Sequence, residues 1–223
     1  MPTSTSSRRA PASRTGTSAR PTRVRMPRAQ REEQILTVAE LVFAENGYSA
    51  TTMEDIAERV GVTKPLIYEY FGSKEGLLSA CITRARTQLR EATESAWESV
   101  GPTASLEEVF RAGIHAFFTF IDGHATAFVL IQQEGAVASQ ASPLIESIRE
   151  QQSAATVAAF RAAPSLAGVP ETLLEGYAEV VIGACERLAV WRTTRPDVGV
   201  EDATDIVVSS VWGGLAALVP SAG

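Results

Sequence analysis

The chain has 223 residues, of which 45% are apolar and 21% are charged, and its formal net charge is −6. This length is enough for one or two domains with a substantial core, and two cysteines are too few for a disulfide scaffold or a zinc cluster. The acidic balance by itself argues against a nucleic-acid-binding protein, because such proteins usually carry a basic surface.

The first 28 residues differ in composition from the rest of the chain. They hold seven arginines and no acidic residue, and most of the other residues are Ser, Thr, Pro, Ala or Gly. A segment of this kind buries too little apolar surface to offset the entropy lost on ordering. We therefore expect residues 1–28 to be a disordered, arginine-rich tail.

Four helices are predicted in the next part of the chain, at about 28–45, 53–60, 64–71 and 74–100. Glycines at the helix ends mark where three of them stop, and a Gly-Pro pair ends the fourth. Thr52 is followed three residues later by Asp55, which is the spacing of a capping box. Thr63 and Ser73 are expected to cap the third and fourth helices through their side chains.

Five more helices are predicted at about 106–121, 125–133, 143–162, 170–193 and 200–218. No stretch alternates between apolar and polar residues as a half-buried strand does, so we assign no strands. The sequence therefore predicts an all-α fold of about nine helices. It consists of an N-terminal three-helix domain with a helix-turn-helix and a C-terminal helical bundle.

No segment is expected to enter a membrane. The longest nearly apolar run, residues 206–219, has 14 residues and contains two serines, whereas a membrane-spanning helix needs about 20. The N-terminus has no apolar stretch of the kind found in a secretory signal. We therefore expect a cytoplasmic protein.

The most informative stretch is residues 52–71, where two short helices flank a glycine turn. This is the pattern of a helix-turn-helix, whose second helix enters the major groove of DNA. Ile67 and Phe71 are expected to face inward, which leaves Thr63, Lys64 and Tyr68 on the outer face. Hydroxyl groups and cations at a helix start are suited to phosphate contacts.

This region resembles the DNA-binding domain of the tetracycline-repressor (TetR) family of bacterial regulators. The resemblance covers about residues 29–89, and its motifs are Asn46-Gly47-Tyr48, Ala50-Thr51-Thr52, Ile56-Ala57, Gly61-Val62-Thr63-Lys64, Tyr68-x-Tyr70-Phe71 and Ser73-Lys74-Glu75-x-Leu77. It implies an all-helical homodimer with a DNA-binding domain at 29–76 and a ligand-binding and dimerisation domain at 77–223. The DNA contacts that it implies are Thr52, Thr63, Lys64, Tyr68, Tyr70 and Lys74. Pro65 and Glu69 depart from the pattern of many relatives.

A cavity for a small apolar or aromatic effector is expected in the C-terminal domain, where aromatic side chains gather beside a few polar ones. Its candidate residues are Trp97, Phe117, Phe118, Phe128, Gln132 and Tyr177. The alternative is that these aromatic residues only form the core, since they lie at helical spacing. No cofactor is predicted, and no metal is expected, because His115 and His124 are not spaced as ligands on one helix.

The last two predicted helices are apolar on more than one face. Such helices bury one face in their own domain and another against a partner. We therefore expect them to pair in a four-helix interface between two copies. The candidate interface residues are Val181, Leu188, Val211, Trp212 and Leu215. A monomer that buries both faces within itself is the alternative.

Together with what the resemblance to the TetR family implies, these features favour a ligand-responsive repressor that binds a pseudo-palindromic operator as a homodimer and releases it when a small molecule binds. We expect it to be associated with the nucleoid while it is bound to DNA. The alternatives are a helical protein-interaction module without DNA binding and a ligand-binding helical enzyme. The chain is not expected to be an enzyme, because it has no phosphate-binding loop, GxSxG or HExxH motif. The arginine tail has three interpretations. It is an arm that binds DNA, an inert tail that improves solubility, or an artefact of the choice of start site, with translation beginning instead near Met26.

Overall fold

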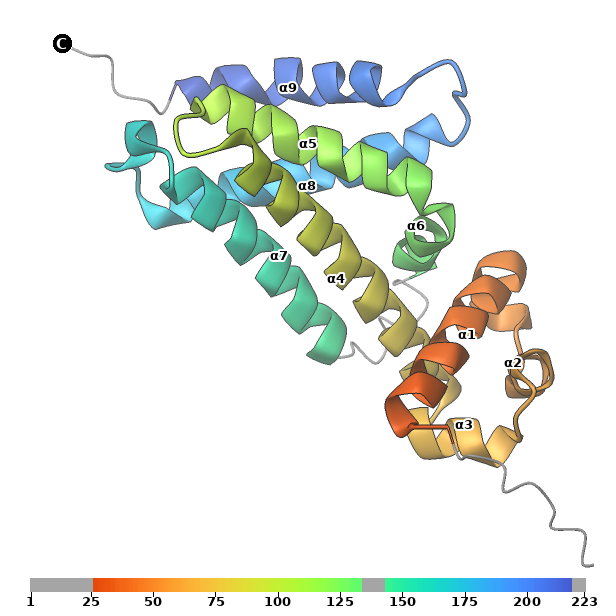
Figure 1. Ribbon diagram of the computed structural model, residues 1–223. Helices are drawn as coiled ribbons and strands as arrows, with labels where there is room; N and C mark the ends of the chain where they lie inside the picture. The colour runs from red at the N-terminus through yellow and green to blue at the C-terminus, as the bar shows by residue number, and fades with distance from the viewer. Residues whose placement is uncertain (1–25, 134–142, 218–223) are drawn as a thin grey trace, which may run out of the picture.

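The computed structural model describes residues 26–133 and 143–217. These residues form α-helices and one short 3-10 helix, which confirms the predicted all-α fold (Figure 1). The elements in chain order are α1 (Arg28–Ala50), α2 (Met53–Val60), α3 (Lys64–Phe71), α4 (Lys74–Val100), α5 (Leu106–Gly123), α6 (Ala125–Gln132), α7 (Pro143–Arg161), η3 (Pro164–Leu166), α8 (Glu171–Arg192) and α9 (Val200–Ala216). Residues 1–25 of the predicted tail, and the predicted end of the last helix at residue 218, lie outside the described residues.

The helix boundaries follow the local signals in the sequence. Gly47 has φ 74° and ψ 163°, so it breaks α1 where the first helix was predicted to stop, and the last residues of α1 follow this kink. Thr52 and Asp55 form the predicted capping box: the Thr52 side chain accepts from the Asp55 amide at 3.2 Å, and the Asp55 carboxylate accepts from the Thr52 amide at 3.0 Å. Ser73 also caps α4 as predicted.

The predicted side-chain cap of α3 is wrong. Thr63 occupies the N-cap position with extended backbone angles, but its hydroxyl forms no capping hydrogen bond. Pro65 stands in the first turn of this helix. A proline there has no amide hydrogen to be capped, and its fixed φ already suits a helix start.

The helices enclose two hydrophobic cores that meet along α4. The first core is built from α1, α2, α3, the start of α4 and Leu130 of α6. The second core is built from the rest of α4 together with α5 to α9. The change from one core to the other lies within α4, between Ile82 and Ala85. Leu77 and Leu78, which follow the predicted domain boundary at residue 76, are fully buried in the first core.

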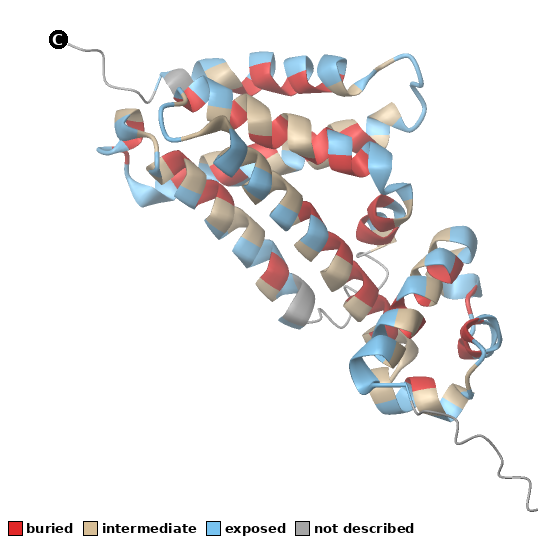
Figure 2. Ribbon diagram, in the orientation of Figure 1, coloured by how far each residue is buried: buried red, intermediate tan, exposed pale blue. Residues whose placement is uncertain are grey.

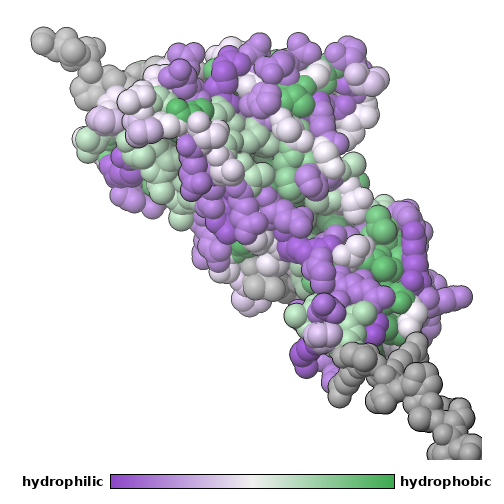
Figure 3. Space-filling model, viewed as in Figure 1, coloured by the Kyte–Doolittle hydropathy of each residue, from purple (hydrophilic) through white to green (hydrophobic). Residues whose placement is uncertain are grey.

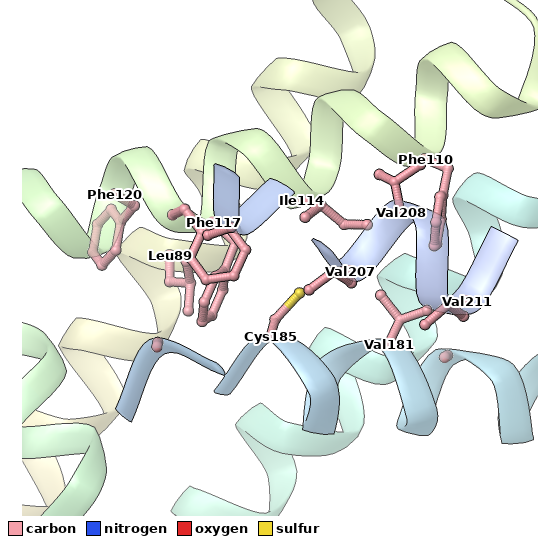
Figure 4. Packing of buried hydrophobic residues seen from close by; sticks show 14 of the residues in the cluster. Leu89, Phe110, Ile114, Phe117, Phe120, Val181, Cys185, Val207, Val208 and Val211 are labelled. Atoms are coloured by element: carbon pink, nitrogen blue, oxygen red, sulfur yellow. The ribbon is translucent and has the colours of Figure 1, made fainter. Parts of the chain in front are cut away.

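The second core is held together by α5, which lies between α4, α8 and α9. Phe110, Ile114 and Phe117 project from α5 toward Val181 and Cys185 of α8 (Figure 4). Burial raises the pKa of the Cys185 thiol, so this cysteine packs as a small apolar side chain. Among the described residues no single helix is long and apolar enough to span a membrane; only α5 and α6 taken together pass that test, across a bend of 101°.

Candidate DNA-binding surface and ligand cavity

The short helix α3 is anchored on one side and exposed on the other. Ile67 is fully buried, whereas the other residues of α3 are at least partly exposed. Figure 2 accordingly shows α3 mainly in the colours of exposed and intermediate residues. On the opposite side the side chains of Pro65, Tyr68 and Glu69 are exposed, and Tyr68 is 39% exposed. A large aromatic residue that is this exposed on an anchored helix is available to an external partner.

A cation stands at the start of α3. Lys64 forms an ion pair with Glu54 of α2, and its Nζ lies 5.8 Å from the centroid of the Tyr68 ring. The hydrogen bond between the two side chains raises the pKa of Lys64 and lowers the pKa of Glu54. The pair is solvent-exposed, so a phosphate can replace Glu54 as the partner of Lys64 at little cost.

A second cation lies at the start of α4. The Nζ of Lys74 is 4.3 Å from the centroid of the Tyr48 ring, and the Tyr48 hydroxyl donates a hydrogen bond to Glu75. Burial and this hydrogen bond raise the pKa of Tyr48 to about 12, and the same hydrogen bond lowers the pKa of Glu75. Lys74 is therefore held against the corner that Gly47 introduces at the end of α1.

The other three predicted DNA contacts differ in their exposure and in the partners that they already have. Thr63 is exposed. The Thr52 hydroxyl is exposed but already donates to Asp55 at 2.7 Å. Tyr70 is only half exposed, and the guanidinium of Arg28 lies 4.7 Å from the centroid of its ring. Sequence reasoning overlooked Arg28 and Tyr48 as members of this surface, although Tyr48 belongs to one of the motifs quoted above.

A cavity of about 50 Å³ lies in the second core between α4, α5, α7 and α8. Its wall is mostly apolar, with polar atoms from two threonines and one glutamine. The residues that line it are Thr93, Trp97, Val109, Phe110, Gly113, Ile114, Phe117, Gln152, Thr156, Ala159, Phe160, Val181, Ile182 and Cys185. A groove of about 710 Å³ runs along the outer side of α7 and α8, and Gln152 and Ile182 line both the groove and the cavity.

Only two of the six predicted ligand residues, Trp97 and Phe117, line this cavity. Phe118 is fully buried, with its ring 5.1 Å from that of Phe117, and Phe128 is buried elsewhere in the core. Gln132 is exposed at the end of α6, and Tyr177 lies beside Gly214 of α9. The prediction missed the residues from α7, because helical periodicity does not reveal which residues of separate helices meet.

The predicted interface residues are mostly covered within the chain. Val181, Val211 and Leu215 are at most 9% exposed, so they have little surface left for a partner. Leu188 and Trp212 are partly exposed. Helices α8 and α9 expose other large apolar residues instead, namely Leu173, Val180, Trp191 and Ile206. Figure 3 shows small hydrophobic groups among the mainly hydrophilic residues along α9.

Polar contacts tie the first core to the second. Arg84 of α4 forms ion pairs with Glu33 and Glu40 of α1, and its Nε donates to Glu40 at 2.7 Å. After α6, the side-chain amide of Gln133 donates to the carbonyl oxygen of Phe43 at 3.0 Å. These contacts join α1 to α4 and to the residue that follows α6.

Comparison with known proteins agrees with this arrangement. Residues 35–81 match the family profile described as "Bacterial regulatory proteins, tetR family", and residues 106–214 match "Tetracyclin repressor-like, C-terminal domain". The HTH-type transcriptional activator FasR of Mycolicibacterium smegmatis is 29% identical over 196 residues, which is 86% of this chain and 85% of that protein. The HTH-type transcriptional repressor BepR of Brucella suis is 30% identical over 133 residues, which is 59% of this chain and 63% of that protein. A crystal structure of a TetR-like transcriptional regulator from Rhodococcus sp. RHA1 is 30% identical, with a TM-score of 0.64 over 86% of this chain and 99% of that one.

Proposed function

Because the chain belongs to the tetR family of bacterial regulatory proteins, we propose that it binds a pseudo-palindromic operator as a homodimer and represses transcription there. The relatives are described as HTH-type or TetR-like transcriptional regulators. This favours a DNA-binding regulator over a protein-interaction module or an enzyme. A small apolar or aromatic molecule releases the proposed repressor from its operator.

The observation that carries the operator-binding proposal is the exposed side of α3, where Lys64 and Tyr68 stand on a helix anchored by Ile67. A helix of this size fits the major groove, and its N-terminal residues reach base edges while hydroxyls and cations hold phosphates. In a two-fold dimer two copies of α3 would enter successive major grooves about 34 Å apart. Lys74 would then contact the backbone beside each groove.

A mobility shift with DNA from beside the gene tests this proposal. We expect Tyr68→Ala to abolish or strongly weaken the shift without lowering the melting temperature, because Tyr68 is 39% exposed. Val129→Ala on α6 is the matched control, since that side chain is also 39% exposed and lies outside the surfaces proposed to meet DNA and the partner copy. Normal binding by Tyr68→Ala would overturn the assignment of α3 as the contact helix.

The effector site is proposed to be the cavity between α4, α5, α7 and α8. Ligand pockets usually measure about 300–1,000 Å³, so a cavity of about 50 Å³ must widen to hold an effector. Displacement of α7 or α8 would widen it, because Gln152 of α7 and Ile182 of α8 line both the cavity and the larger groove. An apolar or aromatic effector suits the Trp97, Phe110 and Phe160 side chains, and Gln152 or Thr156 would bind its polar group.

The proposed coupling runs through α4. This helix carries Trp97 at the cavity and Leu77 in the first core, about 30 Å apart along the helix axis. An effector that binds one position of α4 better than another shifts the population toward that position. The two recognition helices then lose the spacing that the operator requires, and DNA in turn weakens effector binding by the same factor.

A thermal-shift screen with apolar and aromatic compounds tests the effector site. Compounds that stabilise the protein are expected to release it from DNA, and Phe160→Leu is expected to weaken both effects together. If the compounds stabilise Phe160→Leu as much as they stabilise the parent protein, the effector site lies elsewhere.

The proposed dimer uses the exposed apolar residues of α8 and α9. A shallow hollow between the two helices is lined by Ala184, Leu188, Trp191 and Ile206. Among the described residues, Val180 of α8 is the most exposed large apolar residue, at 56%. We expect light scattering to give a dimer at micromolar concentration and Val180→Glu to give a monomer. A monomeric parent protein would overturn this part of the proposal.

Repression is distinguished from activation by a reporter fused to the bound promoter. Repression needs only that the protein occupy DNA that the polymerase requires, and we expect deletion of the gene to raise expression. A fall in expression on deletion would instead make the protein an activator, as the M. smegmatis relative is described.

A further inference from the structure

The start of α1 packs beside the recognition helix α3 (Figure 1). Residues 26–28 line a hollow of about 280 Å³ together with Leu66, Glu69 and Tyr70 of α3. The guanidinium of Arg28, the first residue of α1, lies over the Tyr70 ring, 4.7 Å from the ring centroid. Arg28 is therefore held against α3 although it belongs to another helix.

The Arg28 side chain has no acidic partner among the described residues. Residues 26–76 contain five basic and nine acidic side chains. Two of these cations, Arg59 and Lys64, form ion pairs with glutamates, and Arg31 donates to a neighbouring glutamine at 2.6 Å. By contrast, the Arg28 guanidinium forms no ion pair or hydrogen bond with any residue that the structure describes, and it contacts only the ring. Its N–H groups are available to an external acceptor.

The geometry of α3 places Arg28 on one flank of the face proposed to meet DNA. An α-helix turns by about 100° per residue, and the exposed face of α3 includes Tyr68 and Glu69. Lys64 lies to one side of this face, and Leu66, which shares the hollow with Arg28, lies to the other. The two cations therefore flank the exposed face from opposite sides.

A helix inside a major groove meets phosphates on both of its flanks. A helix with its side chains measures about 10–12 Å across, and the major groove is about 12 Å wide. The helix therefore fills the groove, and its two flanks face the sugar-phosphate backbones of the two strands. With α3 in the groove, Lys64 faces one of these backbones and Arg28 faces the other.

An arginine that is stacked on an aromatic ring is suited to such a contact. A guanidinium binds phosphate oxygens through two parallel hydrogen bonds, and it can do so while one of its faces rests on a ring. The ring restricts the side chain before DNA arrives, so less conformational entropy is lost when the phosphate binds. This role uses the ring of Tyr70 and does not use its hydroxyl group.

We propose that Arg28 contacts a backbone phosphate of the operator on the side of the major groove opposite Lys64, and that the Tyr70 ring positions the guanidinium for this contact. The proposal rests on the proposed operator binding. It adds a cation from α1 to the DNA-binding surface. It also changes the role of Tyr70 from a DNA contact to a positioning residue.

Binding to a fluorescent duplex from beside the gene, measured between 50 and 200 mM salt, tests the phosphate contact. Each contact contributes about 0.9 to the slope of log K against log salt, so Arg28→Gln should lower the slope of a homodimer by about 1.8. The fall in affinity over this salt range then becomes about 12-fold smaller. Arg31→Gln is the matched control, because it removes the same charge from the next turn of α1, where the side chain is already bonded to Gln34. Equal slopes for Arg28→Gln and Arg31→Gln would overturn the contact.

Variants of Tyr70 test the positioning role. Tyr70→Phe keeps the ring and is expected to bind DNA as the parent does. Tyr70→Leu removes the ring and is expected to weaken binding about 2- to 5-fold per subunit, with no further loss when Arg28→Gln is already present. Equal losses in Tyr70→Phe and Tyr70→Leu would show that the hydroxyl binds DNA and would overturn the positioning role. Additive losses in the double variant would overturn it as well.

Two further outcomes separate this contact from operator binding. Melting temperatures from circular dichroism should match the parent for Arg28→Gln, because this side chain is exposed. A parent protein that binds the duplex with the same salt slope as Arg28→Gln would overturn the contact while operator binding stands. A parent protein that does not bind the duplex would overturn operator binding itself, and the contact with it.

Discussion

Replacing Gly76 by alanine tests the close packing of the recognition helix against α4. A Cβ atom on Gly76 would lie 2.2 Å from the carbonyl oxygen of Phe71 and 3.4 Å from its carbonyl carbon. Ordinary contacts between carbon and a carbonyl oxygen begin at about 3.3 Å, so the two backbones must separate by about 1 Å. Because Phe71 is the last residue of α3, this displacement acts directly on the recognition helix.

The expected cost follows from the type of contact. Overpacking costs about 1–3 kcal/mol, and the contact here is with backbone, which cannot rotate away as a side chain can. Alanine recovers at most about 1 kcal/mol through its higher helix propensity. We therefore expect a net loss of about 1–2 kcal/mol, which lowers the melting temperature of a chain of this size by about 2–8 °C.

Circular dichroism during thermal and urea unfolding measures this change, and Gly123→Ala is the matched control. Gly123 is also helical, but it is exposed, and nothing lies within 4 Å of its added Cβ. The control is therefore expected to be neutral or to gain up to about 1 kcal/mol. The reasoning is refuted if Gly76→Ala proves as stable as Gly123→Ala. Weaker DNA binding should accompany the loss of stability in Gly76→Ala alone.

Three further predictions follow from buried or paired side chains. Leu130→Ala should cost about 2–5 kcal/mol in urea unfolding, because this α6 residue is fully buried in the first core; a loss below about 1 kcal/mol would contradict that packing. Gly113→Ala should displace the Trp97 indole, whose Nε1 lies 2.3 Å from the added Cβ, and an unchanged tryptophan fluorescence spectrum would argue against it. Tyr48→Phe removes the hydrogen bond to Glu75 and should destabilise the chain most between about pH 5 and pH 10. At lower pH, Glu75 loses its contribution to stability as the pH falls through its lowered pKa. At higher pH, Tyr48 loses its contribution as the pH rises toward its raised pKa of about 12. A destabilisation that does not vary with pH would show that the two groups are not coupled.

The local features of the fold could be predicted from the sequence. The helices from α2 to α5 begin within a residue of their predicted starts, because caps and glycines act on the adjacent turn only. The inward face of α3 was also predictable, since Ile67 follows the helical spacing of the apolar residues. The side-chain cap at Thr63 failed because Pro65 already fits the helix start.

The ligand cavity shows where sequence reasoning stops. Trp97 and Phe117 were predicted and line it, whereas Phe118, Phe128, Gln132 and Tyr177 do not. Each aromatic side chain carries the same periodic signal whether it meets the cavity or the solid core. The contribution of Phe160 and Thr156 depends on how α7 crosses α4 and α5, which no local pattern records.

The sequence by itself determined the composition of each helix, the helix-turn-helix and the contrast between the arginine-rich first 28 residues and the acidic remainder. Only the tertiary structure decided which apolar face of α8 and α9 is covered. Val211 and Leu215 turn inward, whereas Val180 and Ile206 are left exposed. The tertiary structure also places Leu130 of α6 in the core of the first domain. The physical reason is that local capping and periodicity establish a helix, but a helix with several apolar faces is oriented only by the shapes of the helices that pack against it.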